Sequence, residues 1–327
     1  MNLATIRDVA RESGLSISTV SIVLNGKAHE RKIPLETVQR VNDVAARLNY
    51  RPNRAARMLR GATQRPVVAL FWVLDNRSSF FMRVVRGLEA VFNDQKEPCD
   101  LVIHPYVNGQ LHENEPLLLS GDYDAILIGA MNEEDMAYLE RLQPTTPVYL
   151  LNRISEHFPG CSTDPQQIGS IAADWILYRG CTTLAVVADR NAVVPKTTRR
   201  NAVISACRKH GILSEDELVI YSSNSIAGGM EAAHQILSLS HRPDTIFVDN
   251  DIMALGLSLG LRMQEVTDMP ILCIALNHPD LGHQLLPLSF IDIPGERIGR
   301  ECALQVRNLL YHQQALTSMI CTCEIAE

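Results

Sequence analysis

Residues 3–61 read LATIRDVARESGLSISTVSIVLNGKAHERKIPLETVQRVNDVAARLNYRPNRAARMLRG, and this stretch decides the organisation of the chain. Its apolar residues recur at helical spacing, which predicts a first short helix that ends at Gly14. A second helix is predicted from Ser16 to the Asn25-Gly26 stop. Two short helices joined across a tight turn with glycine form a helix-turn-helix, the motif that lays its second helix in the major groove of DNA.

A third helix is predicted after this pair. Pro34 suits the first helical position, and Pro52 ends the segment because the residue before a proline disfavours the α region. The side chains expected to face inward are Val20, Val23 and Leu24 in the second helix and Val38, Val41, Ala45 and Leu48 in the third. The sequence therefore predicts a small three-helix unit with its own apolar core.

The charges of the chain are divided sharply between this unit and the rest. Residues 1–65 contain 12 Lys and Arg against five Asp and Glu, which is a net charge of +7. The whole chain carries −7, so residues 66–327 carry −14. A basic head on an acidic body indicates a protein whose head meets a polyanion such as DNA and whose body does not.

The composition is that of an ordinary globular protein. Its 327 residues suffice for two or three folding units, and 46% of them are apolar. No apolar run approaches the ~20 residues of a membrane span, and the N-terminus lacks the pattern of a secretory signal. We expect a cytoplasmic protein with no membrane contact.

The eight cysteines lie mostly among apolar residues and form no CxxC pair. A zinc site requires paired Cys or His at ligand spacing, so we expect reduced core thiols. His104, His157 and His283 are isolated in sequence and are expected to be structural, and Trp72 and Trp175 are assigned to packing. The sequence predicts no metal and no other cofactor.

The segment from Pro66 onward alternates between strand-like and helix-like runs. The apolar strand-like runs are 67–73, 101–106, 125–129, 148–152, 184–188, 218–221, 245–248, 271–275 and 289–293. The amphipathic helical runs are 80–93, 133–142, 167–178, 197–210, 227–239, 251–264 and 295–311. This alternation predicts an α/β fold of parallel sheets with helices on both faces, and its length favours two doubly wound subdomains. The predicted domains are 1–52 for the helix-turn-helix, 53–65 for a hinge and linker, and 66–327 for the α/β body.

Two classes of function fit this organisation. One is a transcription regulator with a ligand-sensing body, and the other is a cytoplasmic sugar-converting α/β enzyme with a basic N-terminal appendage. The chain contains no GxGxxG after a strand, no GxxxxGK[ST] and no HExxH, which disfavours nucleotide-dependent and zinc enzymes. A Ser-His-Asp triad has no local pattern, so the sequence leaves that option open and no catalytic residue is assigned.

Two motifs of the head resemble those of one family. DVARESGLSISTVSIVLNG resembles the helix-turn-helix of the LacI/GalR family of bacterial transcription repressors, and LNYRPNRAARMLRG resembles the end of that family's third helix and its hinge. A few extra residues in the Lys27–Lys32 loop are similar to the branch that regulates sucrose and fructose use. The resemblance implies a sequence-specific transcription regulator, usually a repressor.

The resemblance also assigns the DNA contacts. The base-reading positions are Ile17, Ser18 and Ile22, and the phosphate-contacting positions are Ser16, Thr19, Ser21, Asn25 and Tyr50. Thr5, Asn53 and Arg54 complete the expected DNA surface. Hydroxyl and amide groups suit phosphate contacts because they form directed hydrogen bonds without bulk. Many members carry Arg where this chain has Ile22, so we expect a different operator core.

Residues 53–61 are expected to form a hinge helix. Two helical turns are too short to be stable alone in water, so this segment would order only when it docks. In the family, two such helices pair in the minor groove, where the residue at the position of Leu59 wedges between base steps and that at Ala56 permits close approach. An ordinary flexible linker is the alternative.

Residues 66–311 resemble the family's effector domain, which is itself similar to periplasmic sugar-binding proteins. The matching stretches are SSFFMRVVRGLE, TPVYLLNR, TTRRNAVISACRKHGI and PDTIFVDNDIMALG. By position, the effector-binding residues are Phe80, Phe81, Asn152, Arg153, Arg199, Asn250 and Asn277, with the two phenylalanines stacked beside the ligand. For Arg199, the alternative is an ordinary arginine on a helix surface.

The expected cleft departs from the family pattern at charged positions. The family commonly has Asp where this chain has Asn152 and Asn277, and Gln at the position of Ile293. The loss of two carboxylates favours an anionic ligand such as a sugar phosphate, with Arg199 as its partner. A second interpretation is that the pocket has lost its ancestral ligand.

The mode of DNA binding implies an oligomer. One head with mostly hydroxyl contacts would bind weakly, whereas two linked heads gain affinity through effective concentration. Twofold operators mirror twofold proteins, so we expect a homodimer formed by the body on a palindromic operator. No C-terminal leucine heptad is present, which argues against a tail-driven tetramer. A small molecule in the cleft would shift the hinge pair, and either release or promotion of DNA binding fits the residues.

Overall fold

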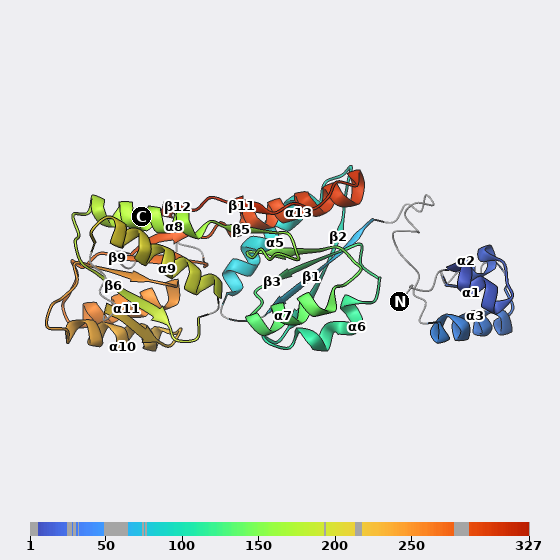
Figure 1. Cartoon of the computed structure of the whole chain (residues 1–327), viewed down its shortest axis with the longest axis horizontal. Helices are drawn as coiled ribbons and strands as arrows, with labels where there is room; N and C mark the ends of the chain where they lie inside the picture. Colours follow the sequence, from blue (N-terminus) through green and yellow to red (C-terminus); the bar gives the residue numbers. More distant parts are fainter. Residues whose placement is uncertain are drawn as a thin grey trace.

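The computed structural model contains a three-helix head and an α/β body built on two sheets (Figure 1). It describes residues 6–24, 28, 31, 33–48, 65–73, 75, 77–192, 194–212, 218–277 and 288–326. The predicted fold class, a helix-turn-helix head followed by two doubly wound subdomains, is confirmed.

The head consists of α1 (Ile6–Ser13), α2 (Ile17–Leu24) and α3 (Leu35–Arg47). Gly14 follows α1 with a φ of 69°, a left-handed conformation that glycine adopts without steric cost. The hydroxyl of Ser16 accepts a hydrogen bond from the backbone N–H of Thr19 at 3.1 Å and so caps the start of α2. The core of the head holds one fully buried valine from each helix: Val9, Val20 and Val41.

The first sheet of the body has the strand order β11-β5-β4-β3-β1-β2, and its strands are all parallel. The strands are β1 (Val67–Val73), β2 (Asp100–Tyr106), β3 (Ala125–Gly129), β4 (Val148–Leu151), β5 (Gly160–Thr163) and β11 (Met319–Cys321). The helices of this subdomain are α5 (Ser78–Phe92), η1 (Leu111–Asn114), α6 (Glu115–Leu118), α7 (Glu133–Leu142) and α13 (Gly295–His312). One face of the sheet packs against α5 and α13, and the other packs against α6 and α7.

The second sheet has the order β12-β10-β9-β8-β6-β7, with β12 antiparallel to β10 and the other pairs parallel. The strands are β6 (Leu184–Asp189), β7 (Val219–Ser222), β8 (Thr245–Val248), β9 (Ile271–Ala275), β10 (Leu288–Asp292) and β12 (Glu324–Ala326). The helices are α8 (Pro165–Tyr178) and α9 (Val194–Lys209) on one face, and α10 (Ile226–Leu237) and α11 (Asp251–Met263) on the other.

The chain passes between the two subdomains three times. The passages lie between β5 and α8, between β10 and α13, and between β11 and β12. An ion pair joins the subdomains beside the second passage, because both guanidinium Nη atoms of Arg83 on α5 donate to the carboxylate of Asp292, at 2.8 and 2.7 Å. Neither subdomain is therefore a continuous stretch of sequence.

The structure adds elements that the sequence pattern does not predict. These are β5, η1, α6, β11 and β12. Each is three or four residues long, and β5 reads GCST, which contains no apolar run. Such short segments become regular because a neighbouring strand or helix supplies their partners, and this is a tertiary effect rather than a local one.

The helix pairs pack closely because glycines lie where they touch. A Cβ atom built on Gly256 of α11 would lie 2.0 Å from the carbonyl oxygen of Ile226 on α10, and one on Gly229 of α10 would lie 2.1 Å from that of Met253. Backbone atoms therefore occupy the space that a side chain would need. The same arrangement joins α5 to α13 at Gly87 and Gly299.

The eight cysteines are buried and free, and the sulfurs of Cys161 and Cys321 lie 3.4 Å apart. Burial raises the pKa of the Cys99 thiol to about 12 and that of Cys207 to about 11. Thiols so far from ionisation are poor nucleophiles, which agrees with a packing role. Within the described residues, no group of three or more His, Cys, Asp and Glu could hold a metal ion, and no helix is long and apolar enough to span a membrane.

Candidate functional site

The outward face of α2 is the candidate surface in the head. Ile17 is 42% exposed and Ser18 is also exposed, whereas Val20 and Val23 point into the head core. The hydroxyl groups of Ser16 and Thr19 lie 2.9 Å apart at the start of α2. A helix N-terminus with hydroxyl groups beside it favours a phosphate, because unpaired backbone N–H groups and the positive end of the helix dipole point there.

Ser21 and Ile22 lie further along the same helix and are half-buried. The predicted DNA-contacting residues of α2 are therefore grouped on one helix, and those with the greatest exposure are at its first turn. Seven of the predicted contacts lie outside the described residues: Thr5, Asn25, Tyr50, Asn53, Arg54, Ala56 and Leu59. The hinge helix expected over 53–61 also lies outside them.

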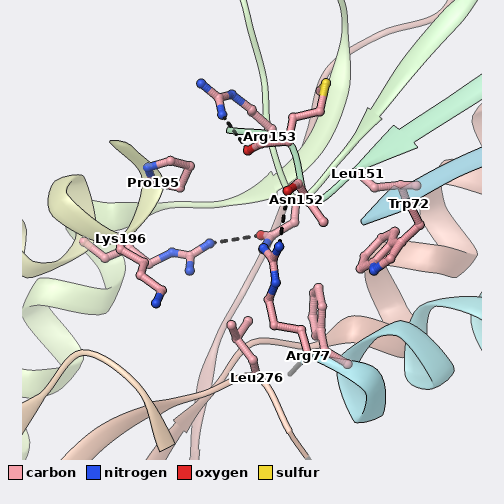
Figure 2. Close-up of a pocket in the computed structure, with 12 residues that line it drawn as sticks. Trp72, Arg77, Leu151, Asn152, Arg153, Pro195, Lys196 and Leu276 are labelled. Atoms are coloured by element: carbon pink, nitrogen blue, oxygen red, sulfur yellow. Dashed lines mark hydrogen bonds between the residues drawn. The ribbon is translucent and has the colours of Figure 1, made fainter. Parts of the chain in front are cut away.

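A cleft between the two subdomains holds two adjoining pockets. The aromatic pocket, of about 50 Å³, is lined by Trp72, Phe80 and Leu151 of the first subdomain and by Pro195 and Arg199 of the second, among others. Figure 2 shows Trp72 and Leu151 on one side of this pocket and Pro195 on the other.

The second pocket, the amide pocket, has a volume of about 170 Å³. Its lining contains five asparagines: Asn108, Asn191, Asn224, Asn250 and Asn277. The two pockets share Arg77, Ala130, Lys196 and Leu276. One ligand could therefore contact both, and its two ends would meet different chemistry.

The carboxyl ends of the parallel strands position these residues. Each asparagine of the amide pocket stands two residues after a strand, and the five strands are β2, β6, β7, β8 and β9. Ala130 follows β3 and Asn152 follows β4, and both adopt the left-handed conformation, with φ of 65° and 55°. Such a conformation is strained for alanine, and strained residues concentrate at ligand sites. Ligands of doubly wound folds bind at this edge of the sheet.

Four of the seven effector-binding residues predicted from sequence line the aromatic pocket: Phe80, Asn152, Arg153 and Arg199. Asn250 and Asn277 line the amide pocket. Phe81 lines neither, because its ring packs against Trp72 at 5.3 Å between centroids. The stacking of Phe81 beside a ligand stays a prediction, whereas Trp72, which is buried in the core, lines the pocket together with Phe80.

Several of these side chains already have partners. The guanidinium of Arg153 donates to both carboxylate oxygens of Glu133, at 2.8 and 2.7 Å. Asn250 caps α11, because its side-chain oxygen accepts a hydrogen bond from the backbone N–H of Met253 at 2.9 Å. These contacts fix the side chains in place before a ligand arrives.

Asn277 is fixed in a similar way on the second subdomain. Its side-chain nitrogen donates to Oδ1 of Asp251 at 3.1 Å, and its backbone N–H donates to Oδ2 of the same carboxylate at 2.7 Å. Asn224 differs, since its side-chain oxygen is buried and accepts no hydrogen bond within the described residues. The residue itself nevertheless lines the amide pocket.

Arg199 is buried rather than on a helix surface. It is 5% exposed, and its Nη2 donates to the side-chain oxygen of Asn152 at 3.0 Å. Burial lowers the pKa of its guanidinium, although arginine stays charged at physiological pH. Nearby, Lys196 donates to Asp189 at 2.8 Å, and the backbone N–H of Asp189 donates to Asp249 at 2.9 Å. Burial raises the pKa of the Asp249 carboxyl.

Sequence reasoning missed Trp72, Arg77, Lys196 and three of the asparagines. Arg77 stands between the two pockets, pairs with Asp75, and donates to the carbonyl oxygen of Ala130 at 3.2 Å. The regular spacing of asparagines after strands is the signal that could have identified the amide pocket.

Comparisons with known proteins agree with this geometry. Residues 5–53 match the family described as bacterial regulatory proteins, lacI family, and residues 173–324 match the periplasmic binding protein-like domain. Catabolite control protein A of Staphylococcus epidermidis is 26% identical over 309 residues, which are 90% of this chain and 91% of that protein. The head is therefore a LacI-family DNA-binding domain, and the chain as a whole is similar to bacterial transcription regulators. The ribose operon repressor of Escherichia coli is 26% identical over 93% of this chain and 92% of its own length.

Solved structures extend the similarity to the fold of the whole chain. A LacI family transcription regulator from Clostridium acetobutylicum has a TM-score of 0.73 and 25% identity over 80% of this chain and 99% of its own. The lac repressor dimer bound to operator has a TM-score of 0.68 and 18% identity over 100% and 98%. The chain is a DNA-binding transcriptional regulator, and the enzyme that the sequence left as an alternative is not supported, because the relatives are repressors.

Proposed function

We propose that this LacI-family protein is a homodimeric repressor that binds a palindromic operator through two heads. A small molecule, either a sugar or a sugar phosphate, occupies the cleft between its subdomains and controls DNA binding. The observation that supports operator binding is the outward face of α2. Ile17 and Ser18 are exposed there, next to the helix start that Ser16 caps. A side chain that reads bases must project from a helix that the groove can admit.

The outermost strands of the body support a dimer. β2 ends the first sheet and β7 ends the second, and an outermost strand presents unpaired backbone groups that favour association. Val102 and Ile103 on β2, and Tyr221 and Ile226 at β7 and the start of α10, are exposed apolar side chains. A second copy of the chain would cover them. The similar lac repressor is a dimer on its operator.

The lining of the cleft supports a small polar ligand. Amide side chains both donate and accept hydrogen bonds, which suits a molecule with many hydroxyl groups. Trp72 and Phe80 supply apolar faces against which a sugar ring can pack. The similar ribose operon repressor is named for a sugar operon, which supports a sugar or its phosphate as the ligand of this pocket.

Selection of genomic DNA fragments bound by the purified protein tests the proposal. We expect enrichment of one palindromic sequence, with a footprint that covers both halves. The protein without residues 1–61 is the matched control and should enrich nothing. Enrichment of unrelated fragments, or of a single asymmetric half-site, would argue against a dimeric operator-binding repressor.

Replacing Ile22 with arginine should change the preferred operator. Isoleucine offers base edges only apolar contact, for example with a thymine methyl, whereas arginine donates two hydrogen bonds to guanine. We expect a shift in preference of about 1–3 kcal/mol at the affected base pair, measured by selection from a randomised operator library. Ile22→Val keeps the apolar contact and should return the original consensus. An unchanged consensus for the arginine variant would mean that this residue does not face the bases.

Replacing Leu59 with alanine should weaken operator binding. Leu59 lies outside the described residues, and its expected role is to wedge between base steps in the minor groove. Without the wedge, the DNA bend is less stable, and we expect a loss of affinity of about tenfold or more. Thermal unfolding of the body should be unchanged. Operator affinity equal to that of the unmodified protein would support the flexible linker instead.

A further inference from the structure

The charges that line the two pockets are unequally paired. The cationic side chains of the lining are Arg77, Arg153, Lys196 and Arg199. Three of them contact a carboxylate: Arg77 contacts Asp75, Arg153 contacts Glu133 and Lys196 contacts Asp189. Within the described part of the chain, Arg199 contacts none. Of the four cations in the lining, Arg199 is therefore the one whose charge a bound anionic ligand would neutralise.

The position of Arg199 makes this lack of a carboxylate costly. The residue is 5% exposed, so water screens its charge poorly. A guanidinium has five N–H donors, and the structure gives Arg199 one acceptor, the neutral side-chain oxygen of Asn152. A buried cation is stable when an anion accepts its remaining hydrogen bonds. The arrangement is thus one that an anion would complete.

The groups around Arg199 come from both subdomains. Asn152 and Arg77 belong to the first, and Lys196 and Arg199 belong to α9 of the second. In Figure 2, Lys196 lies on one side of the aromatic pocket, and Arg77 and Asn152 lie between it and Trp72. Arg77 and Lys196 each contact a carboxylate, so an anion in this pocket would bind chiefly Arg199 of the second subdomain while its hydrogen-bonding partners on the other wall belong to the first. An anionic ligand would therefore favour closure of the cleft.

We propose that the effector is a small polyhydroxylated anion, whose phosphate or carboxylate binds Arg199 in the aromatic pocket and whose hydroxyl groups bind the asparagines of the amide pocket. This inference rests on the proposed function and narrows its ligand from sugars in general to charged ones. It also gives the ligand a direction, with the anion against α9 and the polyol toward Asn224 and Asn277. Asn224 and Asn277 both line the amide pocket, so their amide side chains are hydrogen-bonding groups for that end.

Binding can be followed with the full chain, because it contains two tryptophans and one of them lines the pocket. In the Trp175→Phe variant, fluorescence reports Trp72 alone. The probes are inorganic phosphate, a panel of hexose and pentose phosphates, the matching aldonic acids and the matching neutral sugars. We expect at least one phosphate or aldonate to bind about tenfold or more tightly than its neutral counterpart. The two charged series distinguish a phosphate from a carboxylate.

The variant Asn152→Asp tests most directly whether Arg199 binds an anionic ligand. It would place a carboxylate about where the side-chain oxygen now lies, 3.0 Å from Arg199, so the protein itself would supply the missing anion. We expect the variant to fold, to keep operator binding and to lose affinity for the charged ligand by about 10- to 100-fold. Arg199→Gln should lose similar affinity, and Lys209→Gln, an exposed charge removal on the same helix, should lose none.

Operator binding by the protein with and without each probe, measured in parallel, separates the two proposals. If the protein selects its operator but binds neutral sugars as tightly as charged ones, or binds no probe, the anionic effector is wrong and the repressor stands. The same holds if Asn152→Asp keeps full affinity for the anion. If the protein selects no operator either alone or with any of the probes present, the proposed function fails whatever the cleft binds.

Discussion

Replacing Ile103 with glutamate should make the protein monomeric and lower operator affinity by about 100-fold or more. Ile103 is 40% exposed on β2, the outermost strand of the first sheet. A carboxylate there would lie inside the proposed dimer contact without a partner, and burying it would be costly. Two tethered heads gain about 10²- to 10⁴-fold in affinity over one, and a monomer loses that gain.

The opposite edge of the same sheet provides a matched control. Ile320 lies on β11 and is 53% exposed, so Ile320→Glu makes the same substitution on an outermost strand away from β2. It should leave both assembly and operator affinity unchanged. Sedimentation velocity gives the oligomeric state, and fluorescence anisotropy gives the affinity. A dimer that persists in Ile103→Glu, or one lost equally in Ile320→Glu, would place the contact elsewhere.

Replacing Gly256 with valine should destabilise the body by about 3 kcal/mol or more. A Cβ atom at this position would lie 2.0 Å from the Ile226 oxygen and 2.8 Å from its Cα, and both are backbone atoms that cannot rotate away. Helix α11 cannot retreat easily either, because Met253 and Leu257 are fully buried in the core beneath it. The helices would have to separate, which would open voids in that core.

Urea unfolding of the full chain measures this effect. Leu259→Ala is the control, since Leu259 is on the same helix but partly exposed, and truncation there should cost about 1 kcal/mol or less. An unfolding midpoint for Gly256→Val equal to that of the unmodified protein would mean that α10 and α11 do not touch as closely as described.

Most of the fold could be predicted from the sequence, because its central strands are continuous apolar runs. β1 reads VVALFWV and is buried on both faces, so pattern and environment agree. The helices of the head could also be predicted, because Gly14 ends α1 in a left-handed conformation and the Ser16 hydroxyl caps the start of α2. The strands β5, β11 and β12 could not be predicted, because they become extended by pairing with strands, most of them distant in sequence.

The candidate site was only partly predictable. Asn152 and Arg199 were found by their positions in a family pattern, but the contact between them joins residues 47 apart and needed the fold. The sequence assigns Trp72 to packing, because a tryptophan inside an apolar strand has the pattern of a core residue. That Trp72 also lines the aromatic pocket depends on Gly129 of the neighbouring strand β3. A Cβ there would lie 2.4 Å from the indole, so the glycine makes room for the ring.

The three passages between the subdomains have a consequence for biosynthesis. The first sheet begins with residue 67 yet is completed by β11 and covered by α13, which the ribosome makes only after the strands β6 to β10 of the other sheet. Ile298, Cys302 and Val306 of α13 fill the core that α5 and β1 begin. A nascent chain therefore contains the whole head while both sheets of its body still lack their strands β11 and β12.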